Sequence, residues 1–397
     1  MFGFLEDVTA SKSAWEKALF FSLIASLLFT QISISVVQIF LAVALISWIA
    51  LVARKKTPIA VPSFFWALLA YAALSLVSSA ASVNPGLSFK DSRKLLLYAL
   101  VLVVYTAFRK KGEIDLAYAA LLTSGLVNGL YSTLYFVLRS YPGQRVKGFM
   151  GHYMTQAGIL ALFGSLALAM VVLGKGKERL AWGASLGLCA AALAFTLTRS
   201  AWVGLAVALC IVLPLWKPKT LVLVPVLAAV VFFASPSSIR ARVRSIFSLR
   251  DSSNIARVEY LRTGLKIIKD FPVLGTGPDT VDLVFQNSKY GLSEIARKNV
   301  HLHSNILQIA AERGLITLAA WLAFVITALL NLIRLIRENV PGVRAYAAGA
   351  VAALAALFAA GFFEYNFGDS EVTTLLFFII TLPVALGRVR DARPQSE

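Results

Sequence analysis

Three histidines are the residues of this chain best suited to take up a proton near neutral pH, namely His152, His301 and His303. His303 precedes Ser304, a favourable N-cap, and a segment of helical character from Asn305 to Glu312. A histidine at such a junction can act as a general base, although a polar residue that closes a loop is the more common explanation. No carboxylate or cysteine gives metal-ligand spacing with the histidine pair, so we expect no metal.

Arg199 is the only charged residue between two adjacent apolar runs, in the connector Thr196-Leu197-Thr198-Arg199-Ser200. An ionisable group at a membrane boundary is costly, which favours a functional role. The alternative is a guanidinium that reaches out to lipid headgroups.

Basic residues gather in two further segments, around residues 139–152 and in the stretch 235–314. The candidate ligand-binding members are Arg145, Lys147, His152, Arg257, Arg262 and His301. Arginine stays charged and binds phosphate through two parallel hydrogen bonds, so such a cluster suits a pyrophosphate. Three acids, Glu364, Asp369 and Glu371, stand close together and could pair with these arginines or orient a base.

The elements that must position these residues are membrane-spanning helices. The chain has 397 residues, 58% of them hydrophobic and 15% charged, with a mean hydropathy of +0.76. This composition excludes a soluble single domain and a disordered chain. The predicted spans are 18–34, 36–53, 63–82, 93–108, 114–138, 154–173, 180–197, 201–216, 220–234, 315–333, 345–362 and 371–386. We therefore expect an all-α polytopic membrane protein with about twelve transmembrane helices.

The connectors between spans alternate between basic and weakly charged. The basic set holds Arg54-Lys55-Lys56, Arg109-Lys110-Lys111, Lys175, Lys177, Arg179, Lys217, Lys219, Arg334, Arg337, Arg344, Arg388, Arg390 and Arg393. The positive-inside rule places this set, the lead-in from Met1 to Lys17 and both termini in the cytoplasm.

Residues 235–314 are too polar to span a membrane and too long for a simple connector. The alternation places them outside, which predicts three parts: spans one to nine in 1–234, a periplasmic loop domain in 235–314, and spans ten to twelve with a cytoplasmic tail in 315–397. Within the loop, residues 254–270 have helical periodicity, with an apolar stripe of Val258, Leu261, Leu265 and Ile268. Basic residues flank the stripe, a pattern typical of a helix at a membrane interface.

Three segments resemble motifs of the O-antigen ligase and polymerase family. His303-Ser304-Asn305-Ile306-Leu307-Gln308, followed by Glu312 and Gly314, resembles the histidine element of that family. Thr196 to Gly204 resembles its arginine element, and Arg257-Val258-Glu259-Tyr260 with Asp270 to Pro278 resembles its loop element. Ser304 stands where asparagine is usual and Tyr260 where tryptophan is common. The resemblance covers about residues 140–320.

The resemblance implies a GT-C-like, inverting glycosyltransferase of the bacterial inner membrane that works at the periplasmic face without metal, nucleotide or other cofactor. Its donor would be an undecaprenyl-pyrophosphate-linked O-antigen, its acceptor lipid A–core, and neither nucleic acid nor ATP would take part. By analogy, Arg199 and Arg257 would hold the donor pyrophosphate, and His303 would deprotonate or orient the acceptor hydroxyl. Polymerases of this type often carry two large loops and an arginine–glycine element, which the single loop here lacks; this favours a ligase.

Two other classes fit part of the pattern. A polymerase of the same family would transfer the glycan to a second lipid-linked repeat. A transporter of polyanions or lipid-linked glycans would also need many spans and a cationic outer cavity, but the sequence shows no paired halves that suggest inverted repeats. A structural membrane scaffold would leave the placement of the histidines and arginines incidental.

Overall fold

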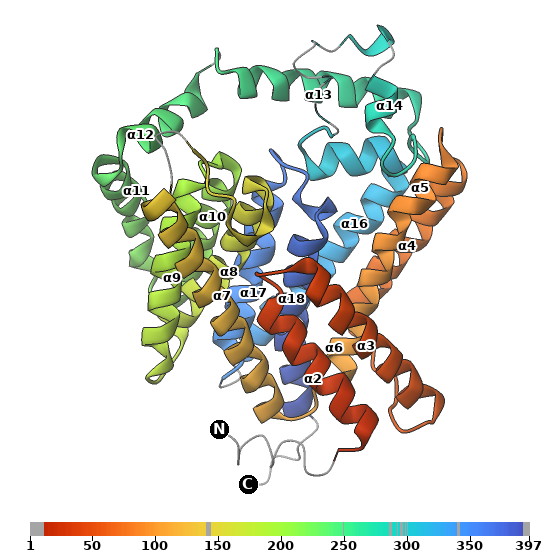
Figure 1. Ribbon diagram of the computed structural model, residues 1–397, viewed down its shortest axis with the longest axis vertical. Helices are drawn as coiled ribbons and strands as arrows, with labels where there is room; N and C mark the ends of the chain where they lie inside the picture. The colour runs from red at the N-terminus through yellow and green to blue at the C-terminus, as the bar shows by residue number, and fades with distance from the viewer. Residues whose placement is uncertain are drawn as a thin grey trace.

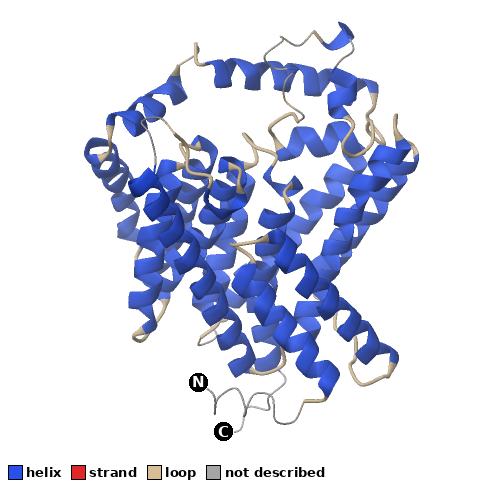
Figure 2. Ribbon diagram, viewed as in Figure 1, coloured by secondary structure: helices blue, strands red, loops and turns tan. Residues whose placement is uncertain are grey.

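The computed structural model describes residues 12–139, 144–248, 250–285, 288–291, 293, 297, 299, 301–339 and 342–391. Most of the predicted cytoplasmic lead-in and the end of the predicted tail, residues 1–11 and 392–397, lie outside these ranges. Within them the chain forms helices, turns and loops but no strand (Figure 2). The expected all-α class is therefore confirmed.

The helices form one bundle with a cap of shorter helices at one end (Figure 1). The first half comprises α2 (Ala14–Phe29), α3 (Ile34–Ala53), α4 (Phe64–Ala80), α5 (Pro85–Ser92), η1 (Arg93–Tyr98), α6 (Ala99–Ala107), α7 (Lys111–Arg139), η2 (Gly148–Met150), α8 (Tyr153–Leu173), α9 (Glu178–Phe195) and α10 (Arg199–Trp216). The second half comprises η3 (Pro218–Val222), α11 (Leu223–Ala234), α12 (Ser237–Arg244), η4 (Ser245–Phe247), α13 (Ser252–Asp270), α14 (Val281–Phe285), η5 (Ser288–Tyr290), α16 (Asn305–Arg337), α17 (Arg344–Ala360), η6 (Asn366–Gly368) and α18 (Ser370–Asp391).

All twelve predicted spans fall largely on helix, but their lengths differ. Within the described residues, six helices are long and apolar enough to cross a membrane: Ile34–Ala53, Lys111–Arg139, Tyr153–Leu173, Arg199–Trp216, Asn305–Arg337 and Ser370–Val389. The predicted span 93–108 is divided between the 3-10 turn η1 and the short α6. The polytopic architecture is thus supported, whereas the count of twelve is not confirmed.

The centre of the bundle is formed by α8, α17 and α18, whose apolar residues are mostly buried. Small residues allow α17 to approach its neighbours closely. A Cβ added at Gly204 of α10 would lie 2.8 Å from the carbonyl oxygen of Ala356 in α17. This close contact fixes α10, and with it Arg199 at its first position, against the centre.

Helix α13 lies across one end of the bundle, opposite the connector between α8 and α9 (Figure 1). Its predicted existence is confirmed, with bounds Ser252–Asp270 and an N-cap by Asp251, whose side chain accepts from the backbone N–H of Asn254. Tyr260, Thr263, Gly264 and Ile267 form its buried face. The predicted apolar stripe faces outward instead, since Val258, Leu261 and Leu265 are exposed.

The predicted break before the tenth span is a kink inside one long helix, α16. Gly314 has φ +81 there, so the boundary at residue 314 falls within α16. The turn after α13 fills the kink, because the N–H groups of Thr276 and Gly277 donate to the carbonyls of Ala311 and Glu312 at 2.9 and 2.8 Å. Gly275 has φ +70 and packs directly on Glu312, which leaves no space for a side chain. The turn with Gly275 and the helix residues around Gly314 therefore pack together at the kink of α16.

Candidate functional site

His303 and Glu364 form a hydrogen-bonded pair at the capped end of the bundle. His303 Nδ1 lies 3.2 and 3.1 Å from the two carboxylate oxygens of Glu364, and its Nε2 lies 3.5 Å from Asn299 Oδ1. The backbone of His303 is left-handed, with φ +48, a conformation that is uncommon for residues other than glycine. A carboxylate that holds one ring nitrogen as a donor leaves the other nitrogen to accept a proton.

The first two turns of α16 position both members of this pair. Gln308 accepts from the backbone N–H of Leu302 at 2.7 Å and so fixes the loop that carries the two histidines. Asn305 accepts from the N–H of Phe367 at 3.1 Å and donates to Asn366 Oδ1 at 2.7 Å, which fixes the loop that carries Glu364. Ser304 caps the helix as predicted, with its hydroxyl accepting from the N–H of Leu307.

The electrostatic surroundings favour an ionised Glu364 carboxylate beside His303. Burial raises the pKa of Glu364, but the hydrogen bond with His303 and nearby charges, including that of Arg257, outweigh it and hold that pKa below its usual value. Burial lowers the pKa of His301, whose ring lies 5.8 Å from that of His303, so His301 is neutral at pH 7. Tyr260 of α13 packs on His303 at 5.4 Å between ring centroids.

Arg199 is an internal anchor in this structure. It is 6% exposed, and its guanidinium donates to Ser245 at 3.0 Å, to Asp251 at 3.0 Å and to Asn254 at 2.9 Å. These bonds tie the N-terminus of α10 to the N-terminus of α13. Every terminal nitrogen of this side chain is thus engaged by the segment that presents α13.

Arg145 holds the turn that precedes Arg199. Its guanidinium donates to the carbonyls of Thr196 and Leu197 at 2.8 and 3.2 Å and stacks 3.3 Å from the ring centre of Tyr153. Burial lowers the pKa of Arg145 to about 10. Leu197 has φ +52, and its carbonyl also accepts from Arg242 at 3.3 Å. The connector singled out in the sequence is therefore a tight turn supported by two arginines.

Arg257 differs from these arginines. It is half-buried on α13, its guanidinium lies 5.8 Å from the ring of Phe363, and among the described residues no hydrogen-bond acceptor contacts it. Burial lowers the pKa of Arg257, and the charge of Arg199 lowers it further. An arginine with unsatisfied donors beside Glu364 and Phe363 is suited to receive an anionic group of a ligand.

The remaining candidates from the sequence are placed around this centre or away from it. His152 is exposed and stacks on Tyr153 with 4.8 Å between ring centroids. Lys147 and Arg262 are exposed side chains for which no contact with His303 is found. The structure therefore brings together His303, His301, Glu364 and Arg257, and leaves Lys147 and Arg262 at the surface.

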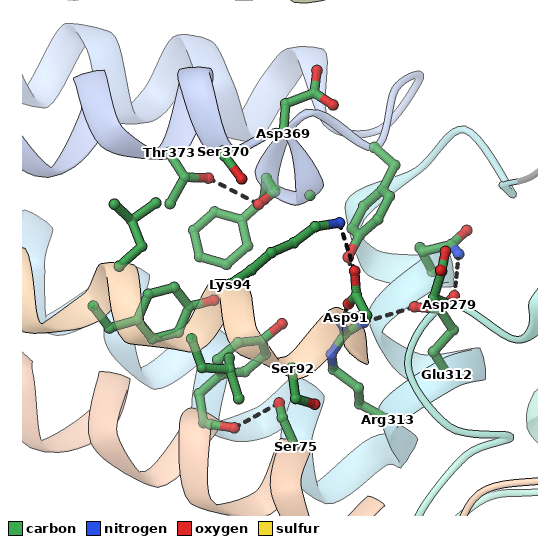
Figure 3. Close-up of a pocket in the computed structure, with 18 of the residues that line it drawn as sticks. Ser75, Asp91, Ser92, Lys94, Asp279, Glu312, Arg313, Asp369, Ser370 and Thr373 are labelled. Atoms are coloured by element: carbon green, nitrogen blue, oxygen red, sulfur yellow. Dashed lines mark hydrogen bonds and ion pairs between the residues drawn. The ribbon is translucent and has the colours of Figure 1, made fainter. Parts of the chain in front are cut away.

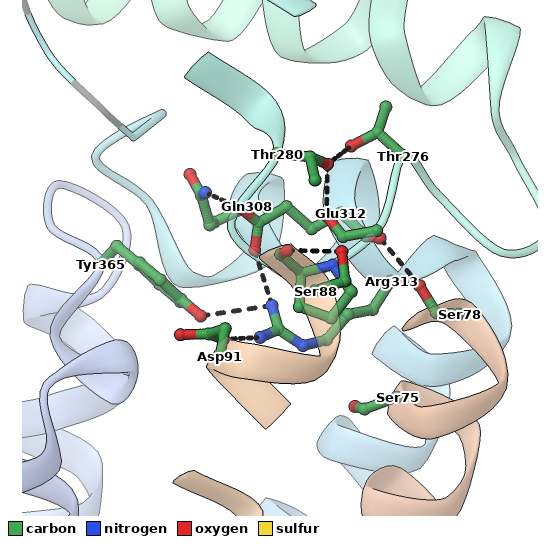
Figure 4. Close-up of polar contacts among 12 residues, drawn as sticks. Ser75, Ser78, Ser88, Asp91, Thr276, Thr280, Gln308, Glu312, Arg313 and Tyr365 are labelled. Carbon is green, nitrogen blue, oxygen red and sulfur yellow. Dashed lines mark hydrogen bonds and ion pairs between the residues drawn. The ribbon is translucent and has the colours of Figure 1, made fainter. Parts of the chain in front are cut away.

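A buried charged network that the sequence analysis did not identify lies beside the pair (Figure 4). Arg313 of α16 donates to Asp91 at 3.2 Å, to Glu312 at 2.7 Å and to the hydroxyl of Tyr365 at 3.3 Å. Gln308 donates to Glu312 at 2.8 Å. The signal for Asp91 was weak, because its partner is more than two hundred residues away in the sequence. This network connects α5, α16 and the loop that carries Glu364.

No cluster of metal-ligating side chains was found in the described part of the chain. The chemistry available at the site is that of an oriented imidazole, a carboxylate and an uncompensated guanidinium. Together they can remove a proton from a hydroxyl and bind an anionic leaving group.

Comparison with known families adds to this geometry. A family model described as O-antigen ligase matches residues 184–322, a segment that begins in α9 and includes α10, α13 and the kink of α16. No curated protein matches the chain. The matched segment holds Arg199, Arg257 and His303, the three residues on which the sequence resemblance rests. The match supports an assignment of residues 184–322 to the O-antigen ligase family.

Proposed function

We propose that this protein is a metal-independent O-antigen ligase. It moves a glycan from undecaprenyl pyrophosphate to lipid A–core and inverts the anomeric carbon. The observation that carries the proposal is the His303–Glu364 pair beside Arg257, whose guanidinium has no hydrogen-bond acceptor among the described residues; His303 and Arg257 lie within the segment that matches the family. An oriented base and a cation for the leaving group are the two catalytic groups such a transfer needs.

The reaction balances on these residues. The acceptor hydroxyl gives its proton to His303 Nε2, while the proton on Nδ1 stays hydrogen-bonded to the Glu364 carboxylate. The acceptor oxygen forms a bond to the anomeric carbon as the bond from that carbon to the pyrophosphate oxygen breaks. The lipid pyrophosphate leaves with both electrons of the broken bond. Arg257 binds its negative charge, which is greater in the transition state than in the donor.

The other arginines receive supporting roles in this proposal. Arg199 is a positioning residue, because its guanidinium is held by Asp251 and Asn254 and so places α13 with Arg257. Arg145 supports the turn before α10. His301, His152, Lys147 and Arg262 contribute to substrate binding around the centre. The sequence-based assignment of Arg199 to direct pyrophosphate contact thereby becomes an indirect one.

The proposed location follows from charge. The basic connectors face the cytoplasm of a bacterial inner membrane, together with both termini, and residues 235–314 lie in the periplasm. The exposed stripe of Val258, Leu261 and Leu265 on α13 suits contact with the outer leaflet. Spans lie in 1–234 and 315–397, and membrane lipids surround them. This arrangement gives a lipid-linked donor access to Arg257 from the membrane plane.

The proposal is tested in a ligase-deficient bacterium that makes both substrates. Wild-type protein should restore capped lipopolysaccharide, and His303→Ala should not, at equal protein levels in the membrane. Asp115→Ala is the control and should retain most capping, because Asp115 pairs with Lys111 at the start of α7 and has no role in the proposed site. Normal capping by His303→Ala would remove the catalytic role of His303.

A further inference from the structure

We propose that the polar pocket beside the His303–Glu364 pair is the binding site for the acceptor sugar, held through its hydroxyl groups. This inference rests on the proposed glycosyl transfer and adds the location and chemistry of the acceptor subsite. The pocket has a volume of about 110 Å³ and is lined by α4, α5, η1, α16, η6 and α18, and by the loops that carry Asp279, His301 and Tyr365. The sequence resemblance assigns no role to Asp91, Asp279 or Asp369.

The pocket adjoins the base through His301. The His301 ring lines the pocket and lies 5.8 Å from the His303 ring and 5.9 Å from the Tyr365 ring. A sugar ring in the pocket would therefore be separated from His303, the proton acceptor, by the His301 side chain. Its neighbouring hydroxyl, or that of the next sugar, can reach His303 Nε2.

The charge of the pocket excludes the donor pyrophosphate. Four carboxylates line it, from Asp91, Asp279, Glu312 and Asp369, against the cations of Lys94 and Arg313. Both cations already contact Asp91, as Figure 3 shows for Lys94, whose ammonium lies 2.5 Å from that carboxylate. Because both cations are already engaged by Asp91, a pyrophosphate would find no free cation among the described residues that line this pocket, whereas the guanidinium of Arg257 has no hydrogen-bond acceptor among the described residues. The pocket thus suits the substrate that brings hydroxyl groups without pyrophosphate to the reacting centre.

The pocket retains free hydrogen-bonding capacity for hydroxyl groups. Asp279 lines it, is exposed, and has no hydrogen-bond partner for its carboxylate among the described residues. Asp369 accepts one bond, from the Thr155 hydroxyl at 3.0 Å, although a carboxylate can accept about four. Tyr365 and Phe367 supply apolar ring surface of the kind that sugar C–H groups contact. Carboxylates that accept from hydroxyl groups beside aromatic rings are a combination suited to a neutral sugar.

The test compares Asp279→Asn with Asp282→Asn in purified full-length protein. Asp279 has φ +60, a conformation that asparagine tolerates, so Asp279→Asn should fold normally. Asp282 is the matched control, because it lies three residues away, undergoes the same change and does not line the pocket. Its carboxylate accepts from the backbone N–H of Leu283 and from no other group among the described residues. The measurements are initial rates against lipid A–core at saturating donor, rates against donor at saturating acceptor, and equilibrium binding of delipidated core oligosaccharide.

We expect Asp279→Asn to raise the KM for lipid A–core about tenfold and to weaken oligosaccharide binding similarly, with the KM for donor unchanged. His301→Gln should likewise raise the KM for lipid A–core and leave the KM for donor unchanged, and Asp282→Asn should change neither KM. An increase in the donor KM, or an unchanged acceptor KM with wild-type transfer intact, would overturn the pocket assignment alone. Absence of transfer by the wild-type protein would overturn the proposed function instead.

Discussion

Two regions of opposite charge flank the His303–Glu364 pair. The arginine region contains Arg145, Arg199, Arg242 and Arg257, with Asp251 and Glu364 as its acids. The acid-lined pocket contains Asp91, Asp279, Glu312 and Asp369, with Lys94 and Arg313 as its cations. Each region is therefore suited to a different substrate group, an anionic leaving group on one side and a neutral, hydroxyl-rich group on the other.

The two regions also differ in how their charges are used. In the arginine region Arg199 is saturated by Ser245, Asp251 and Asn254, whereas Arg257 has no acceptor in the described part of the chain. In the pocket Arg313 is ion-paired with Asp91 and Glu312, whereas the carboxylate of Asp279 has no hydrogen-bond partner among the described residues. The comparison teaches that a buried charge in this molecule mostly holds the fold, and that the unsatisfied member of each region is the one available to a ligand.

The largest predicted effect concerns the pair that both regions share. Glu364→Gln should lower the transfer rate about 10²-fold or more, because the His303 ring loses the carboxylate that fixes its tautomer and stabilises its protonated form. Rates should be measured from pH 5 to pH 9 at saturating substrates.

The pH profile distinguishes orientation of the base from a structural role. Glu364 has a lowered pKa, so it stays ionised down through mildly acidic pH, and the wild-type pair should persist across this range. In Glu364→Gln the rate should depend on pH differently from wild type, because a neutral amide replaces the carboxylate beside His303. A uniform loss of rate with an unchanged profile would assign Glu364 a structural role only.

The next effect separates two of the four arginines of the arginine region, Arg257 and Arg199. Arg257→Ala should lower kcat/KM for the donor about tenfold to a hundredfold with little change in thermal stability, because it removes a charge-assisted contact to the pyrophosphate. Arg199→Ala should lower the melting temperature and broadly weaken activity, because Asp251 and Asn254 lose their buried partner. Melting curves and donor titrations of both variants provide the measurement.

The opposite result for the two variants would contradict the roles assigned to Arg257 and Arg199. If Arg199→Ala folds as stably as wild type and loses only donor affinity, Arg199 contacts the pyrophosphate directly, as the sequence resemblance implies. Arg257→Lys is an informative companion variant, because lysine keeps the charge but not the paired donors.

The sequence predicts the local features of the site well. Ser304 as an N-cap, the helix of residues 254–270 and the candidate base His303 all follow from residues close together in the chain. The pairing of His303 with Glu364 spans 61 residues, and the sequence offered it only as one option for an acidic cluster. Long-range pairs carry no local periodicity, so Asp91 with Arg313 and Arg199 with Asp251 were not predicted.

Hydropathy also has limits that the helices make plain. The stripe on α13 is predicted to face a membrane interface, and Leu261 and Leu265 are exposed, but hydropathy did not predict that Tyr260 and Ile267 form the buried face. The apolar run 93–108 begins as the 3-10 helix η1 and continues as the short helix α6. Local composition predicts that a segment is apolar, but its packing decides how far it extends as a regular helix.

The last predicted effect lies in the pocket and concerns the pH dependence of stability. Burial raises the pKa of Asp369 to about 7, whereas in the unfolded chain this carboxyl titrates near 4. The folded state therefore binds the proton more tightly, and stability is lost as pH rises from about 4 to about 7, by at most about 1.4 kcal/mol per pH unit. Asp369→Asn lacks this carboxyl, so its melting temperature should exceed that of wild type by more at pH 8 than at pH 5. Equal differences at both pH values would contradict the buried carboxyl.

The most direct test of the central claim is transfer by the purified protein in detergent, without nucleotide, metal or ion gradient. Undecaprenyl-pyrophosphate-linked glycan is the donor, and lipid A–core and a second lipid-linked repeat are offered together as acceptors. The proposed function predicts that the wild-type protein forms product on lipid A–core with inverted anomeric configuration, and that His303→Ala forms none. Absence of any transfer by the wild-type protein, or transfer that His303→Ala leaves unchanged, would contradict it.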